Sequence, residues 1–218
     1  EGSVGVTGSV FPAGVSLPQV IESCARRSSF DVPLGPGEPF SPFASLPPNP
    51  AAVRRGRGFA AGSKNVGFSF GFPERCEAEI HLHGEPGDTE PSNADLYHAG
   101  AEVGQGAHQA FLQMASEATG VALDDVEGHF SDTTNTGDSG SASASRLTFM
   151  AGNSIMAAAE VAAKAWAEGE RPAVGFARYV PPETQQLDEE TGQGQPNFSY
   201  GYMAQAVELT VDIETGHI

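Results

Sequence analysis

The sequence predicts an α+β domain in which a mixed sheet is layered with two main helices. Three observations lead to this fold class. Several short segments alternate apolar and polar residues, as half-buried strands do. Two longer segments place apolar residues at helical spacing. Strands and helices alternate only in part along the chain, which favours a mixed layered domain, and the 39% hydrophobic content is enough for a core.

The first predicted element is a short helix over residues 16–29. Ser16 and Gln19 have the spacing of a capping box, in which each side chain bonds the backbone of the other. Pro18 is tolerated because a backbone N–H in the first turn of a helix has no acceptor within the helix, so the N–H that proline lacks is not needed.

A proline-rich connector follows this helix. Seven prolines between residues 31 and 50 exclude a persistent helix or a central strand. From residue 58 to 71 glycine and phenylalanine recur, which predicts a strand or loop with close backbone approach. We therefore assign residues 1–57 to an N-terminal arm and residues 58–218 to a partial α+β domain.

The next elements are a strand pair and two helices. Residues 76–83 alternate and predict a strand, and residues 94–100 its returning partner. Residues 106–119 carry a continuous apolar helical face that ends at Gly120. An alanine-rich helix is expected over residues 145–168.

Three further strands are predicted. They cover residues 125–132, 173–180 and 197–213, and the last contains a change of apolar parity that predicts a bulge. Residues 212–218 read as the end of a strand, a turn and the start of a return strand. We therefore expect the chain to be an internal piece of a longer polypeptide.

Charge and composition exclude several classes of protein. Eleven basic and 28 acidic residues give a net charge of −17, which excludes a nucleic-acid binder because phosphate contacts need a basic face. The basic residues concentrate before residue 76, in a short run at Arg54, Arg55 and Arg57. No apolar run is long enough to span a membrane. Two cysteines form no disulfide framework, which favours a reducing, cytoplasmic location.

Two loops rich in glycine and serine each lead directly into a helix. The first reads Glu102-Val103-Gly104-Gln105-Gly106-Ala107-His108, and the second runs from Thr136 to Ser145. Backbone N–H groups at a helix start form a natural anion site. Two such starts in one domain predict that a pyrophosphate is held from two sides, although a lone Gly-x-Gly is more often a structural turn.

Two other motifs offer different chemistry. Gly137-Asp138-Ser139-Gly140-Ser141 is similar to the nucleophile segment of serine proteases, but no histidine has the expected sequence context and a helix follows. A serine hydrolase using Ser139 is thus a remote alternative. His81-Leu82-His83 places two imidazoles on one strand face, but a third ligand is not evident and a solvated face is the commoner case. We assign no metal site.

Several segments in order resemble the molybdenum-binding subunits of the xanthine dehydrogenase and aldehyde oxidase family. They are Arg55–Ala60, Gly100–Gly106, Ser131–Thr133, Ala144–Thr148 with Gly152-Asn153, and Ala206–Gly216. The resemblance implies a molybdopterin cofactor, often as a cytosine dinucleotide, and hydroxylation of an aldehyde or N-heterocycle with oxygen from water. It also implies iron–sulfur and FAD domains or subunits as electron-transfer partners.

The resemblance assigns cofactor contacts by position. They fall on the two loops, mainly through backbone amides: Gly104, Gln105, Gly106 and Ala107 in the first, and Ala144, Ser145, Arg146 and Thr148 in the second. The cofactor performs the redox chemistry, while the protein holds and orients it.

No catalytic residue is assigned within the chain. The family's general base is a glutamate in a Gly-x-Gly-Glu stretch expected after residue 218, and the similar stretch at Glu38 lies on the wrong side of the Gly-Gln-Gly motif. We therefore expect an inactive fragment of an oxidoreductase subunit that associates with the rest of that subunit. A non-catalytic scaffold that kept the fold is the alternative.

Overall fold

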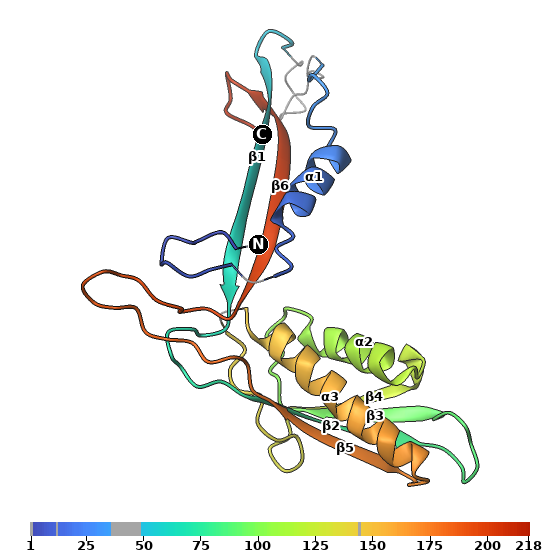
Figure 1. Cartoon of the computed structure of the whole chain (residues 1–218). Helices are drawn as coiled ribbons and strands as arrows, with labels where there is room; N and C mark the ends of the chain where they lie inside the picture. The colour runs from blue at the N-terminus through green and yellow to red at the C-terminus, as the bar shows by residue number, and fades with distance from the viewer. Residues whose placement is uncertain (1, 12, 36–48, 144) are drawn as a thin grey trace. The chain divides into compact units, whose positions relative to one another are not determined.

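The computed structural model describes residues 2–11, 13–35, 49–143 and 145–218. Contacts divide the chain into two units (Figure 1). The ribbon unit comprises Glu1–Gly2, Phe11–Lys64 and Tyr200–Ile218, and the layered unit comprises Ser3–Val10 and Asn65–Ser199. Much of the predicted connector lies outside the described residues, and the predicted division at residues 57 and 58 stays a prediction.

The ribbon unit contains a two-stranded sheet and one helix. Strands β1 (Val53–Val66) and β6 (Ser199–Asp212) pair with each other, and helix α1 spans Leu17–Arg27. Arg57 supplies part of the connection between them. Its guanidinium donates hydrogen bonds to three backbone carbonyls that follow the helix, at 2.8–3.0 Å, and forms an ion pair of 2.7 Å with Glu208 on β6.

The predicted capping box of helix α1 is wrong. The helix forms close to the predicted range, but the Ser16 side chain makes no capping hydrogen bond. Ser16 has φ −102° and ψ 8°, whereas a capping residue normally has an extended backbone that turns its side chain toward the first helical amides.

The layered unit contains a four-stranded mixed sheet with strand order β4-β3-β2-β5. Strand β2 (Cys76–His83) pairs antiparallel with both β3 (Asn93–His98) and β5 (Ala173–Tyr179), while β3 and β4 (Val126–Phe130) are parallel. This arrangement confirms the predicted α+β class with a mixed sheet. Each strand lies within three residues of its predicted bounds at either end.

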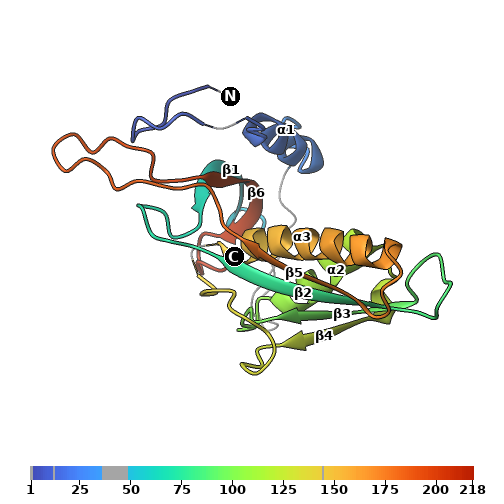
Figure 2. The same ribbon diagram turned by 60° about the horizontal axis from the view of Figure 1, so that its bottom comes forward.

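Two helices cover one face of this sheet, as Figure 2 shows. Helix α3 (Leu147–Ala167) packs on β2 and β5, and α2 (Ala107–Thr119) packs on β3, β4 and α3. Fully buried side chains from every layer form one core, including Ile80, Leu96, Phe111, Met150 and Ile155. Gly120 ends α2 with φ 77°, as its position in the sequence predicts.

The order of elements brings the starts of both helices to one edge of the sheet. Helix α2 connects β3 to β4, and α3 connects β4 to β5. Since β3, β4 and β5 run in the same direction, both helices return against them and begin where β3 and β4 end (Figure 2). The carboxyl ends of parallel strands are the usual place for ligands in such sheets.

Among the described residues, no helix has the length and apolar character needed to cross a membrane.

Glycine 175 sets how closely α3 approaches the sheet. A Cβ at this position of β5 would lie 2.1 Å from the carbonyl oxygen of Ala158 and 2.4 Å from the backbone nitrogen of Ala162. Both are helix backbone atoms and cannot rotate away. Any side chain here must therefore move the helix from the sheet.

We expect Gly175→Ala to lower the free energy of unfolding by about 3 kcal/mol, the upper end for overpacked cores. Urea denaturation of the chain measures this. Gly152→Ala is the matched control, because a Cβ there meets only the end of the Met114 side chain at 3.4 Å and alanine favours the helix by about 1 kcal/mol. Equal stability of the two variants would contradict the close approach.

Candidate functional site

The loop before helix α2 is folded around the carboxylate of Glu102. One carboxylate oxygen accepts hydrogen bonds from the backbone N–H groups of Gly104 at 2.7 Å and Gly106 at 3.0 Å. The other accepts from the N–H of His108 at 3.2 Å. The loop is therefore an anion-binding turn at a helix start, and the anion that it binds in this structure is the side chain of Glu102.

The charge of Glu102 is stabilised by this geometry. Desolvation acts to raise the pKa of Glu102, but hydrogen bonds from the backbone of Gly106, His108, Gly104 and Ala107 together outweigh it and lower the pKa below the usual glutamate value. A carboxylate that accepts several N–H groups is favoured in its ionised form.

Gly104 and Gly106 are required by the backbone of this loop. They have φ values of 97° and 78°, a region that residues with a side chain rarely adopt. A Cβ at either would meet nothing within 4 Å, so both glycines face open space. The side chain of Gln105 turns back to the loop, donating to the carbonyl of Ala101 and accepting from the N–H of Val103.

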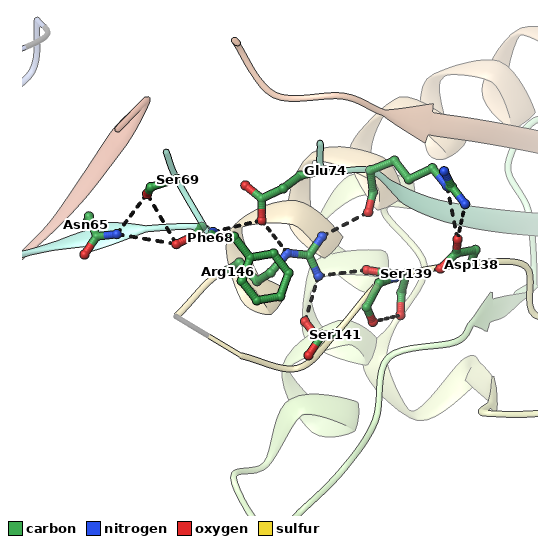
Figure 3. Close-up of polar contacts among 11 residues, drawn as sticks. Asn65, Phe68, Ser69, Glu74, Asp138, Ser139, Ser141 and Arg146 are labelled. Atoms are coloured by element: carbon green, nitrogen blue, oxygen red, sulfur yellow. Dashed lines mark hydrogen bonds and ion pairs between the residues drawn. The ribbon is translucent and has the colours of Figure 1, made fainter. Parts of the chain in front are cut away.

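The loop before helix α3 is organised around the buried guanidinium of Arg146 (Figure 3). Its Nη1 donates to the carbonyls of Ser139 at 3.0 Å and Ser141 at 2.7 Å, and its Nη2 to the carbonyl of Arg75. Its Nε forms an ion pair with Glu74 at 2.8 Å. Two of these four bonds hold the serine- and glycine-rich segment, and the other two connect it to Glu74 and Arg75.

Glu74 links this loop to a second backbone segment. The same carboxylate oxygen that pairs with Arg146 accepts the backbone N–H of Phe68 at 3.1 Å, and the Phe68 ring lies 5.5 Å from the guanidinium carbon. The side chains of Glu74 and Arg146 are only 2% and 1% exposed. In contrast, the ion pair between Arg75 and Asp138 is exposed.

The structure brings most of the predicted contact residues to the same edge of the sheet. Ser145 is exposed with φ 55°, and Thr148 is exposed in the first turn of α3. Ala107 is buried at the start of α2. Arg146 differs from the other residues, because its backbone N–H donates to the carbonyl of Ser143 and its side chain points inward. Ala144 lies outside the described residues, as does Glu38.

From the sequence, no role was assigned to two acidic residues of the site, Glu74 and Glu102. Glu102 lies inside the recognised motif, two residues before Gly104, and that short spacing was the available signal. Glu74 is 72 residues from Arg146, so nothing local connects them.

Ser139 does not have the setting of a nucleophile. It is buried, and its hydroxyl donates to the carbonyl of Gly140 at 3.2 Å. Its own carbonyl accepts from Arg146. The segment that resembles a protease motif is a turn around an arginine.

A buried histidine supports the base of the first loop. His98, the last residue of β3, accepts the backbone N–H of Gly100 at its Nδ1 and lies 3.4 Å from the Cys76 sulfur at its Nε2. Desolvation, with a smaller contribution from the charge of His108, lowers the pKa of His98 to about 4. His98 therefore remains neutral and acts as an acceptor at neutral pH.

The comparisons with known proteins connect this geometry to a family. A family model described as a molybdopterin cofactor-binding domain matches residues 46–168, more than half of the chain. The match includes both loops. No curated protein matched the sequence.

Solved structures match almost the whole chain. Aldehyde oxidoreductase from Desulfovibrio desulfuricans is 26% identical with a TM-score of 0.65, and that from Desulfovibrio gigas is 23% identical with a TM-score of 0.68. Quinoline 2-oxidoreductase from Pseudomonas putida is 14% identical with a TM-score of 0.57, a likeness of fold. Each alignment covers 99% of this chain but only 23%, 23% and 31% of the matched chains, respectively.

We expect Arg146→Met to lower the free energy of unfolding by roughly 3–5 kcal/mol, because it leaves the Glu74 carboxylate buried without a partner. Arg75→Met, which breaks the exposed pair with Asp138, should change it by less than about 1 kcal/mol. Urea denaturation compares the two. Similar losses would show that the buried arginine does not hold the loop.

We expect His98 to make the chain less stable in acid. Because its folded pKa of about 4 is below the usual histidine value, only the unfolded state takes up its proton as the pH falls from about 6.5. The loss should reach about 3 kcal/mol near pH 4.

Denaturation at a series of pH values measures this loss. His98→Asn keeps an acceptor for Gly100 but cannot titrate, so its stability should change less between pH 6.5 and pH 4. An unchanged pH dependence in the variant would assign the effect to other groups.

Proposed function

Because the chain belongs to the molybdopterin cofactor-binding domain family, we propose that it binds the phosphate-bearing part of that cofactor within a molybdenum hydroxylase subunit. The observation that carries the proposal is the position of the two loops. Both precede helices that begin at the same edge of the sheet, and the family match includes both. A pyrophosphate or dinucleotide needs donors from more than one direction, which two such loops supply.

The donor set of the first loop fits an anion. Three of its backbone N–H groups already bind one carboxylate at 2.7–3.2 Å, so Glu102 takes the part that a phosphate oxygen would take. The open space beside Gly104 and Gly106 supports close approach by a ligand. In this proposal Glu102 keeps these N–H groups oriented until a phosphate oxygen replaces its carboxylate.

The roles of the individual residues follow from their positions. Gly104, Gln105, Gly106 and Ala107 would offer backbone N–H groups at the start of α2. Ala144, Ser145 and Thr148 would contribute backbone and hydroxyl groups at the start of α3. Arg146 would act as a positioning residue, because its side chain holds the loop from inside. The bound cofactor supplies the redox chemistry, and these residues bind and orient it.

At the level of the whole protein, we propose an oxidoreductase that hydroxylates an aldehyde or N-heterocycle with water oxygen. The matched aldehyde and quinoline oxidoreductases support this substrate range. The cofactor would be molybdopterin, in the cytosine dinucleotide form, with iron–sulfur and FAD groups on partner domains or subunits. The general base would lie outside this chain. The free thiols of Cys24 and Cys76 agree with a cytoplasmic location.

The test uses the full-length subunit with Gly106→Ala. The new methyl group occupies the open space beside the loop and strains a backbone at φ 78°. We expect at least a tenfold loss of bound molybdenum, measured by elemental analysis, and of the nucleotide released by acid. Gly120→Ala is the matched control, since Gly120 ends the same helix with φ 77° and open space around it.

Both variants carry the same backbone strain of about 1–2 kcal/mol, so only the position of the methyl group differs. Equal cofactor loss in the two would contradict a contact at Gly106. If the unaltered full-length protein contains neither molybdenum nor nucleotide, the chain is a scaffold that kept the fold. The 218-residue chain alone should show no hydroxylase turnover.

A further inference from the structure

The sheet face that is turned away from the helices carries a cluster of metal-ligating side chains. Strand β2 alternates, so His81 and His83 lie on this face while Ile80 and Leu82 enter the core. Asp95 on β3 lies directly opposite His81 in the antiparallel pairing. Asp95 is 12 residues from His83 and 14 from His81 in the sequence, so only the strand pairing shows that it lies beside the two imidazoles.

The three side chains converge closely enough to share one ion. The Nε2 atom of His83 lies 3.0 Å from a carboxylate oxygen of Asp95. One ligand atom from each of His81, His83 and Asp95 lies within 4.8 Å of the other two. Ligand atoms on a tetrahedral zinc ion are about 3.3 Å apart, given bonds of about 2.0–2.1 Å. Small rotations of the side chains are therefore sufficient.

The chemistry of the donor set selects the kind of ion. Two imidazoles and one carboxylate suit Zn²⁺ and similar transition metals, while Mg²⁺ and Ca²⁺ prefer oxygen ligands alone. Glu79 adds negative charge, since its carboxylate lies 2.6 Å from the Nε2 of His81. The ligands are half-buried on neighbouring strands, which fixes their backbones before any ion arrives.

We propose that His81, His83 and Asp95 form a binding site for one divalent transition-metal ion, of which Zn²⁺ is the representative. The site is separate from the two loops. His83 is the last residue of β2 and Cys76 is the first, and the loops meet the sheet at the Cys76 end of the strand. With three protein ligands it leaves a coordination position for water or for a fourth group.

A neighbouring group provides the internal comparison. Asp95, Glu127 and His129 also place ligand atoms within 4.8 Å of one another, with His129 Nε2 3.7 Å from Asp95. This group has one imidazole and two carboxylates, so a transition metal should prefer the pair of imidazoles. Asp95 belongs to both groups, and His83 and His129 each belong to one.

The experiment is calorimetric titration of the full chain with ZnCl₂ in the presence of excess Mg²⁺. We expect one saturable site. His83→Ala and Asp95→Asn should each weaken binding about 100-fold or more, because loss of an outer-shell partner alone commonly weakens metal binding 10- to 100-fold. His129→Ala and Glu127→Gln should weaken binding less than either of these, by about tenfold or less, because His129 would contact the ion only through Asp95. Circular dichroism checks that each variant is folded.

Co²⁺ provides a second measurement that reports on geometry. The intense visible absorption of tetrahedral Co²⁺ should appear with the unaltered chain and disappear in His83→Ala but persist in His129→Ala. Absence of saturable Zn²⁺ binding would overturn the proposal. Binding that depends on His129 and not on His83 would also overturn it, since the ion would then occupy the neighbouring group.

Discussion

The buried ion pair between Arg146 and Glu74 is the interaction on which the candidate site depends. Removing two charges from water is unfavourable, and the pair is stable only because hydrogen bonds satisfy the remaining donors. The acceptors for the remaining N–H groups of Arg146 are the backbone carbonyls of Ser139 and Ser141 in the loop itself and the carbonyl of Arg75. The arginine therefore fixes a segment that has few apolar side chains of its own.

Each of the two loops is held in shape by one charged side chain, but the two side chains have opposite charges. The second loop surrounds a buried cation with backbone carbonyls, and the first surrounds an exposed carboxylate with backbone N–H groups. In the first, Glu102 stabilises the start of α2 through the favourable interaction of negative charge with a helix N-terminus. A loop that holds its own anion keeps its N–H groups oriented in the absence of a ligand. This preorganisation lowers the ordering cost of binding a phosphate.

The sheet separates two kinds of chemistry. Its covered face is a continuous apolar core in which Gly175 allows close contact with α3, and the polar groups there, such as His98, are hydrogen-bonded. Its other face carries histidines and carboxylates in cross-strand pairs. Period-two alternation of the strands produces both faces from the same short segments. The two loops lie at a third place, where β3 and β4 end. The core, the polar face and the loops are therefore built from different residues.

Sequence alone predicted the helices and the strands of the layered unit, because helix and strand periods, proline positions and helix-ending glycines are local properties. In the ribbon unit, β1 begins five residues before the predicted range of 58–71. Helices α2 and α3 and strand β2 were predicted within two residues of their bounds, and the Gly-Gln-Gly motif indicated the anion-binding turn. Tertiary structure decided what the polar side chains do. Arg146 was assigned to the cofactor-binding side but lies inside its loop, since its partner Glu74 is 72 residues away. Asp95 joined His81 and His83 only through strand pairing. Side-chain partners distant in sequence are selected by burial and pairing register, and neither is encoded in local spacing.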